Sequence, residues 1–202
     1  MNDDLHIAFS HIEGSTKEDL HNEGRRILQL IDFAAADFTI AREENGRPYF
    51  SDHHSDFNIS HSKNAAAVIC SKKKHNGKLL RTSVDIQYVD FQKDRMGIAL
   101  KAFYENEIAY IKNARTQDES IKRFYKIWVL KEVSAKLKDG SVFDMKKLPC
   151  FINNKLQIEL APALVSAADP VIGEFTLREL KWECKNGIET YMFAAALERW
   201  QQ

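Results

Sequence analysis

Two oxygen-bearing side chains stand next to each other on one predicted strand. Asp85 and Gln87 are separated by one residue, and Val84 and Ile86 alternate with them. Because a strand has a period of two, Asp85 and Gln87 point to one face, about 7 Å apart at their Cα atoms, and the apolar pair points to the other. Carboxylate and amide oxygens at this spacing suit a hard cation such as Mg²⁺. An ordinary wet sheet face is the alternative, since half-exposed strands also alternate in this way.

A second charged pair lies on a predicted helix. Apolar or small residues recur at helical spacing over residues 121–135, without Gly or Pro. Trp128, Glu132 and Lys136 follow at intervals of four, so they form one row on the stripe expected to face the interior. Burying a charge without a partner is costly. The row therefore predicts either a metal or phosphate site on a rigid helix, or a Glu–Lys ion pair on a partly wet face.

The elements that position these residues are helices followed by strands, twice over. Thr16, with Asp19 three residues later, predicts the start of the first helix, and Gly140 predicts the end of the last. The patterns predict helices over 17–36, 91–113 and 118–138, and strands over 5–9, 37–41, 57–60, 65–70, 79–89, 151–153, 156–160, 174–184 and 189–197. This order predicts an α+β fold of two similar halves, residues 1–88 and 89–202, that meet at one interface.

Turn signals suggest how some strands pair. Asn154-Lys155 and Lys185-Asn186-Gly187 each lie between predicted strands and indicate hairpins, and Asn45-Gly46-Arg47-Pro48 predicts a turn. Asn76-Gly77 is the most favourable two-residue hairpin turn, so we expect 79–89 to fold back on 65–70. The basic tip at 72–78 would keep a sheet edge soluble, and contact with an acidic partner is the other possibility.

Composition is that of an ordinary globular chain. The apolar fraction is 44%, and 29 basic residues balance 29 acidic ones, so net charge favours neither nucleic acid nor an acidic membrane as a partner. Cys70, Cys150 and Cys184 lie far apart, which favours buried thiols over disulfides, and they lack zinc-ligand spacing. The N-terminus is acidic and no long apolar run follows it, so we expect no signal peptide and no membrane span. We expect a cytoplasmic protein.

Four short segments, in order, resemble the Sfp-type 4′-phosphopantetheinyl transferases. That family carries Gly-Lys-Pro, Phe-Asn-x-Ser-His-Ser, Gly-Ile-Asp-Ile-Glu and Trp-x-x-Lys-Glu-x-x-x-Lys. The corresponding segments here are 46–48 (Gly-Arg-Pro), 57–62 (Phe-Asn-Ile-Ser-His-Ser), 83–87 (Ser-Val-Asp-Ile-Gln) and 128–136 (Trp-Val-Leu-Lys-Glu-Val-Ser-Ala-Lys). Residues 103–107 also resemble the family's Phe-x-x-x-Glu segment, so the resemblance covers about 25–136.

The resemblance implies a pseudo-dimer of two α+β halves with coenzyme A bound in the cleft between them. Such an enzyme transfers the phosphopantetheine arm of coenzyme A to a serine of an apo acyl or peptidyl carrier protein and releases 3′,5′-ADP, with Mg²⁺ bridging the pyrophosphate. A monomer is implied, because the two halves already supply the interface that single-half relatives form between chains.

The resemblance also assigns roles to residues. Asp85 and Glu132 would hold Mg²⁺, with Gln87 acting through water or not at all, and Glu132 would also accept the serine proton, directly or through a metal-bound water. Lys136 would neutralise phosphate charge, as such transfers depend on charge neutralisation. The remaining coenzyme A contacts would be Ser60 and His61 at the 3′-phosphate, Arg47 and Arg25 near the nucleotide, and Lys131, for which a surface position is the alternative. Taken alone, His61 would read as a strand-end histidine.

Three positions depart from the family pattern. Gln87 replaces the usual Glu, and an amide is a poorer ligand for Mg²⁺. Ser83 and Lys63 each replace a Gly, and Lys63 could add a phosphate contact. These departures leave two other functions open, a non-catalytic coenzyme A-binding protein and an interaction module of the same fold. The intact row of Glu132 and Lys136 favours the enzyme.

Overall fold

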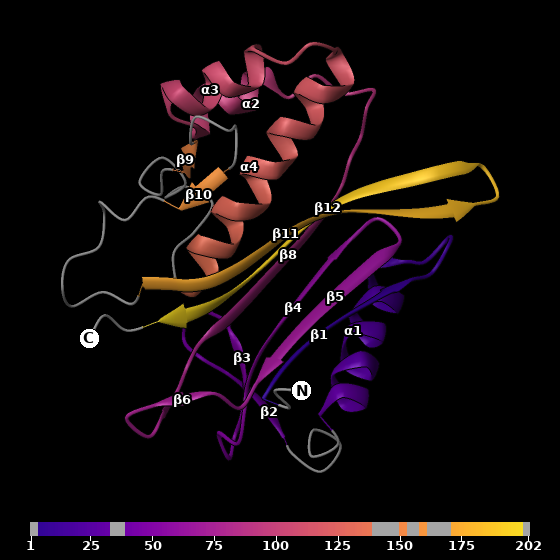
Figure 1. Ribbon diagram of the computed structural model, residues 1–202. Helices are drawn as coiled ribbons and strands as arrows, with labels where there is room; N and C mark the ends of the chain where they lie inside the picture. The colour runs from indigo at the N-terminus through magenta and orange to yellow at the C-terminus, as the bar shows by residue number, and fades with distance from the viewer. Residues whose placement is uncertain (1–3, 33–38, 139–149, 153–157, 161–170, 200–202) are drawn as a thin grey trace.

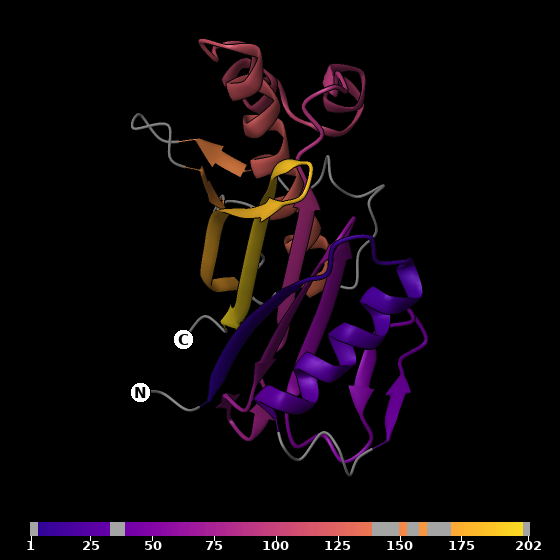
Figure 2. The ribbon, with the colours of Figure 1, turned by 90° about the vertical axis from the view of Figure 1, so that its right-hand side faces the viewer.

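The computed structural model describes residues 4–32, 39–138, 150–152, 158–160 and 171–199, and two antiparallel sheets dominate it. In the first sheet, β5 (Ala65–Ser71) lies between β1 (Leu5–His11) and β4 (Asp56–Ser62). Helix α1 (Lys17–Ile31) packs against this sheet (Figures 1 and 2). Gly24 permits the close approach, since a Cβ there would lie 2.6 Å from Ile59 Cγ2.

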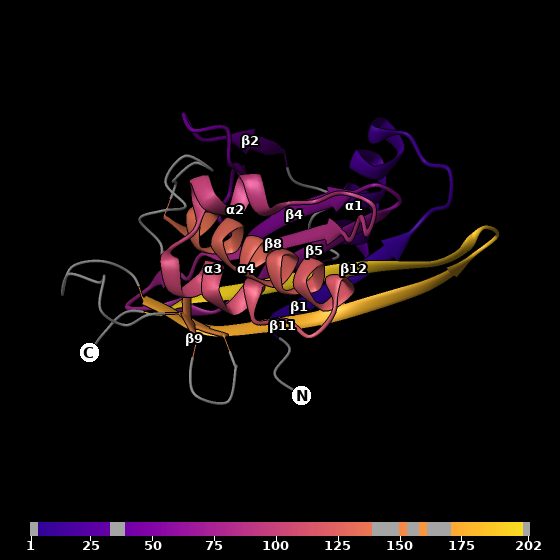
Figure 3. The same cartoon turned by 90° about the horizontal axis from the view of Figure 1, so that it is seen from above.

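The second sheet has β12 (Gly187–Arg199) between β11 (Val171–Cys184) and β8 (Thr82–Tyr88). Helix α4 (Gln117–Leu137) lies across β8 and β12, and the short helices α2 (Met96–Ala102) and α3 (Glu105–Lys112) lie beside it (Figures 1 and 3). The other strands form small antiparallel pairs: β2 (Ile40–Arg42) with β3 (Pro48–Phe50), β6 (Lys74–His75) with β7 (Lys78–Leu79), and β9 (Cys150–Ile152) with β10 (Ile158–Leu160).

The two sheets share an apolar core. Alternate residues of β5 and β12 face α1 and α4 respectively, and their neighbours along each strand pack between the sheets. In this shared core, Phe9 meets Phe193 edge-on with ring centroids 4.6 Å apart. Val84 and Ile86 of β8 lie in the same core, fully buried, as the period of two predicts. The layers therefore run helix, sheet, sheet, helix.

Where the sheets meet, β4 and β8 run parallel and are joined through side chains. Four polar side chains of β4 accept hydrogen bonds from the backbone N–H groups of alternate β8 residues. Each donor residue lies 26 positions after its acceptor in the sequence. The acceptor pairs are Asp56 with Thr82 at 2.6 Å, Asn58 with Val84 at 3.1 Å, Ser60 with Ile86 at 3.4 Å and Ser62 with Tyr88 at 3.0 Å. We call these four contacts the β4–β8 seam. They satisfy amide donors of β8 that would otherwise be buried without partners.

Most predicted elements are confirmed. Helix α4 matches the prediction for 118–138, and α1 begins at the Thr16–Asp19 capping box. The predicted helix over 91–113 is two helices, because Phe103 is extended and the Glu107 carboxylate accepts the Tyr104 N–H to begin the second. The hairpin at Lys185-Asn186-Gly187 is confirmed, and the turn predicted at 45–48 connects β2 to β3, a strand that was not predicted. The helix segment 33–36, residues 37 and 38 of the predicted strand 37–41, the Asn154-Lys155 turn and Gly140 lie outside the described residues.

One predicted pairing is wrong. The Asn76-Gly77 turn closes the two-residue strands β6 and β7, and the longer strands on either side do not pair with each other. Strand β5 is buried along its whole length between β1 and β4, whereas β8 pairs with β12. The fold is thus α+β, as predicted. The boundary at residue 88 stays a prediction, and β8, which precedes it, pairs with β12.

The seam generates a test of stability. Replacing Asn58 by Ala should lower the free energy of unfolding by about 1–3 kcal/mol, because the buried Val84 N–H loses its acceptor. That corresponds to a melting temperature about 2–12 °C lower, measured by differential scanning calorimetry. Asn113→Ala, at an exposed position after α3, is the matched control and should change stability by less than about 0.5 kcal/mol. Equal melting temperatures for the two variants would contradict a stabilising role for the seam.

Candidate active site

Asp85 is the centre of the polar cluster beside the seam. It is buried on β8, with 2% of its surface exposed. Its Oδ1 accepts hydrogen bonds from Ser60 Oγ and from Lys136 Nζ, both at 2.8 Å, and its Oδ2 accepts from Gln87 Nε2 at 3.2 Å. Lys136 Nζ also donates to the Val84 carbonyl at 3.0 Å. The strand residues and the helix residue predicted to share a site therefore meet.

Glu132 lies one turn before Lys136 on the same half-buried row of α4. Burial raises the pKa of the Glu132 carboxyl, and the negative charge of Asp85 raises it further, against an opposing effect of Lys136. The ion pair of Lys136 is made with Asp85. Lys136 is therefore not held by an i,i+4 ion pair with Glu132. The carboxylates of Asp85 and Glu132 both lie near the single ammonium group of Lys136.

A pocket of about 370 Å³ opens next to Glu132. Aromatic side chains and cations dominate its wall, and Gln87 also contributes to it. The lining residues are Ser62, Lys63, Gln87, Tyr88, Asp90, Lys93, Arg95, Ile98, Phe124, Tyr125, Trp128 and Glu132. Trp128 stacks on Phe124 with centroids 5.7 Å apart. Such a mixture suits a ligand with both apolar and anionic parts.

His61 lies on the opposite face of β4 from Ser60, toward α1. Burial lowers the pKa of the His61 imidazole, and the nearby positive charges of Lys17, His21 and Lys136 lower it further. Several cations that repel a proton from one imidazole also create a positive potential that favours an anion. Sequence reasoning missed Lys17 and His21. Their spacing was the available signal, because Lys17, His21 and Arg25 follow at intervals of four along α1 and form one row.

Two predicted coenzyme A contacts lie elsewhere in structural ion pairs. Arg47 is buried and donates from Nη2 to Asp56 Oδ2 at 2.7 Å and to the Thr82 carbonyl at 2.8 Å, at the far end of the seam from Asp85. Lys131 is fully buried, and its Nζ lies 2.9 Å from Glu107 Oε2. The surface position considered for Lys131 is therefore wrong. Arg25 is exposed on α1.

The two positions where glycine is replaced have different surroundings. Lys63 adopts φ 52° in the two-residue turn between β4 and β5, a left-handed conformation that favours glycine. Its Nζ lies 2.9 Å from Glu189 Oε1 and 3.7 Å from the centre of the Tyr88 ring. Ser83 is fully buried, and its hydroxyl has no hydrogen-bond partner among the described residues.

The electrostatics of Glu132 predict a pH-dependent change in stability. A carboxyl whose pKa is raised by folding destabilises the native state once pH passes above its unfolded value, because its ionised form is disfavoured there. Glu132→Gln should therefore be more stable than the unchanged protein at pH 7, and this gain should disappear below about pH 4. Urea unfolding at several pH values measures it, with the exposed Glu44→Gln as control. A gain that does not depend on pH would contradict the assignment.

Comparison with known proteins supplies one relative. Over 99 residues the chain is 36% identical to a Haemophilus influenzae protein named "Putative 4'-phosphopantetheinyl transferase". The matched stretch is 48% of this chain and spans 39% of that relative's length. No protein-family model matches the chain. Among the residues that the structure describes, no helix is long and apolar enough to cross a membrane.

Proposed function

We propose that this protein is a 4′-phosphopantetheinyl transferase, which moves the phosphopantetheine arm of coenzyme A to a serine hydroxyl of an apo carrier protein and releases 3′,5′-ADP. The observation that carries the proposal is the ion pair of Asp85 with Lys136, next to Glu132, whose pKa is raised by burial and then by the charge of Asp85. The motif order and the relative named for this activity support it.

The residues present fit a divalent cation. Burial and, after it, the negative charge of Asp85 raise the pKa of Glu132, and a nearby divalent cation would oppose both effects. Asp85 and Glu132 would hold Mg²⁺, and the amide oxygen of Gln87 would reach it through water. When bound, Mg²⁺ neutralises charge on the pyrophosphate of coenzyme A.

The protein's own residues would supply the rest of the chemistry. Glu132 would take the proton of the attacking serine, directly or through a water molecule, since a carboxylate within hydrogen-bond reach of the reacting hydroxyl can act as a general base. Lys136, held on Asp85 at 2.8 Å, would stabilise negative charge that develops on the transferred phosphate. Ser60 would act indirectly, because its hydroxyl donates to Asp85 and fixes that carboxylate.

The cations around His61 would bind the 3′-phosphate of coenzyme A. Lys17 supplies local positive charge, Arg25 extends the row along α1, and the imidazole N–H groups of His61 and His21 would donate hydrogen bonds to the phosphate. Arg47 would contribute by fixing β8 through Asp56 and the Thr82 carbonyl. Lys131 would likewise position α4 through its pair with Glu107.

The proposed architecture is a pseudo-dimer of two α+β halves with the site in the cleft at the seam. A helix packed on a three-stranded sheet occurs on each side of the seam, which supports it. The protein would act as a cytoplasmic monomer on an acyl or peptidyl carrier protein.

The direct test is the intact mass of an apo acyl carrier protein after incubation with this protein, coenzyme A and Mg²⁺. We expect the carrier protein to gain the mass of one phosphopantetheine. In a parallel incubation with EDTA, which removes the cation, we expect no gain. Several carrier proteins should be tried in parallel. Coenzyme A binding without transfer to any of them would favour a non-catalytic coenzyme A-binding protein, an alternative suggested by the Gln87 amide on Asp85. Gln87→Glu would then be expected to restore transfer.

Replacing Glu132 by Ala should abolish transfer while the protein still folds. Loss of a general base and metal ligand costs about 10²-fold or more in rate. Initial rates of carrier modification measure it, with circular dichroism as the check on folding and Glu44→Ala as the matched control. Full activity in Glu132→Ala would refute the site.

Replacing His61 by Ala should remove the preference for coenzyme A over 3′-dephospho-coenzyme A. Both ligands are titrated by calorimetry against the unchanged protein and the variant. We expect affinity for coenzyme A to fall about tenfold, the loss of one charge-assisted contact, and affinity for the dephospho form to change little. An equal fall for both ligands would place His61 away from the 3′-phosphate.

A further inference from the structure

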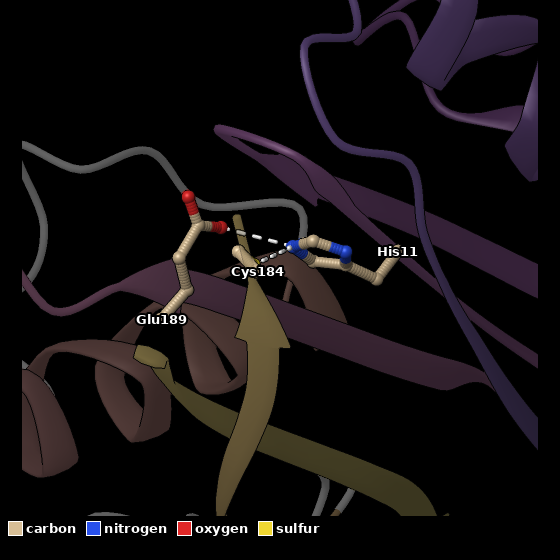
Figure 4. A group of neighbouring side chains, drawn as sticks. All are labelled: His11, Cys184 and Glu189. Carbon is tan, nitrogen blue, oxygen red and sulfur yellow. Dashed lines mark hydrogen bonds and ion pairs between the residues drawn. The ribbon is translucent and has the colours of Figure 1, made fainter. Parts of the chain in front are cut away.

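A second polar cluster brings together residues far apart in the sequence. His11 ends β1, Cys184 ends β11, and Glu189 lies near the start of β12. Figure 4 shows the three side chains converging at the tip of the β11–β12 hairpin. One ligand atom from each lies within 4.8 Å of the others. Imidazole nitrogen, thiol sulfur and carboxylate oxygen are the three ligand types that zinc accepts in proteins.

Two of the three ligand–ligand distances are close to those of tetrahedral zinc sites. Zinc bonds of about 2.0–2.3 Å at tetrahedral angles put ligand atoms about 3.4–3.6 Å apart. Here His11 Nε2 lies 2.9 Å from Glu189 Oε2 and 3.7 Å from Cys184 Sγ. The third pair, Cys184 Sγ and the Glu189 carboxylate, lies within 4.8 Å, and these two side chains would have to move together wherever they lie farther apart than zinc ligands do.

The surrounding residues hold the ligands in place. Tyr191 Oη donates to Glu189 Oε2 at 2.6 Å, and Asn64 Nδ2 donates to Oε1 at 3.0 Å. Trp182 stacks on the His11 ring with centroids 5.1 Å apart. Ligand carboxylates and imidazoles in metal sites are normally fixed by such outer contacts.

Without a metal ion, the contacts of the Cys184 thiol within the cluster are long. Its sulfur makes long contacts, at 3.7 Å each, with His11 Nε2 and with the Trp182 carbonyl. Burial and the charge of Glu189 raise the pKa of the Cys184 thiol, so it is protonated at neutral pH. A bound cation reverses that preference and takes the thiolate as a ligand.

We infer that His11, Cys184 and Glu189 bind a zinc ion, with water at the fourth position. The mixed nitrogen, sulfur and oxygen donor set favours zinc over Mg²⁺ or Ca²⁺, which take oxygen ligands. The ion would join the end of β1 in the first sheet to the β11–β12 hairpin of the second. This inference is independent of the proposed transferase activity.

Cobalt provides the test, because it takes zinc's place and is coloured. The purified full chain is stripped with EDTA, returned to chelator-free buffer and titrated with Co²⁺. We expect a thiolate-to-cobalt charge-transfer band in the near ultraviolet, which one equivalent of Zn²⁺ removes. Cys184→Ala should lose this band, and His11→Ala and Glu189→Gln should each weaken Zn²⁺ binding about 10-fold or more. Cys70→Ala, which removes a buried thiol elsewhere in the core, is the matched control and should keep the band.

Two further measurements complete the experiment. Zinc at a hundredfold excess over its Kd should raise the melting temperature by roughly 5–10 °C in the unchanged protein and not in Cys184→Ala. Lys63→Ala should bind zinc roughly two- to fivefold more tightly, because it removes a cation 2.9 Å from the ligand carboxylate. Absence of the cobalt band in the unchanged protein, or its persistence in Cys184→Ala, would overturn the inference.

Discussion

The rest of this structure depends on one requirement, that the backbone amides at the edge of β8 away from β12 find hydrogen-bond acceptors. One edge of the strand is paired with β12, so the amides of Thr82, Val84, Ile86 and Tyr88 face the other way, into the interior. Strand β4 meets them with side-chain oxygens. This arrangement joins the sheets without a backbone ladder, and it lets the sheets turn their apolar faces toward each other over the shared core.

The candidate active site follows from the same junction. Ser60 accepts the Ile86 N–H and donates to Asp85, so one hydroxyl joins the strands and orients the carboxylate. Lys136 reaches from α4 to the same carboxylate and to the free carbonyl of Val84. The charges of the site are therefore fixed by groups that also hold the two sheets together. Because Asp85 is buried and already hydrogen-bonded to Ser60 and Lys136, its position relative to Lys136 is set before any ligand binds.

Local patterns in the sequence predicted the parts of the structure that local physics determines. The uninterrupted spacing of α4, the Thr16 cap of α1 and the alternation around Asp85 each depend on neighbours in the chain. Partners distant in sequence were not predictable in this way. The pairing of β8 with β12 joins residues about a hundred positions apart, and no turn signal encodes it. Lys131 pairs with Glu107 because α3 packs beside α4, and Cys184 reaches His11 because two sheets converge; ligand spacing along the chain could reveal neither contact.

The chemistry of the seam also bears on how this protein can vary over evolutionary time. A backbone carbonyl in an ordinary sheet is present whatever residue a gene encodes, so no single codon can remove it. The acceptors of the seam belong to Asp56, Asn58, Ser60 and Ser62, and each can be lost or strengthened by one codon change. Mutations can therefore weaken or strengthen the contact between the two sheets without changing the backbone pairing within either sheet. Selection can adjust this contact one hydrogen bond at a time.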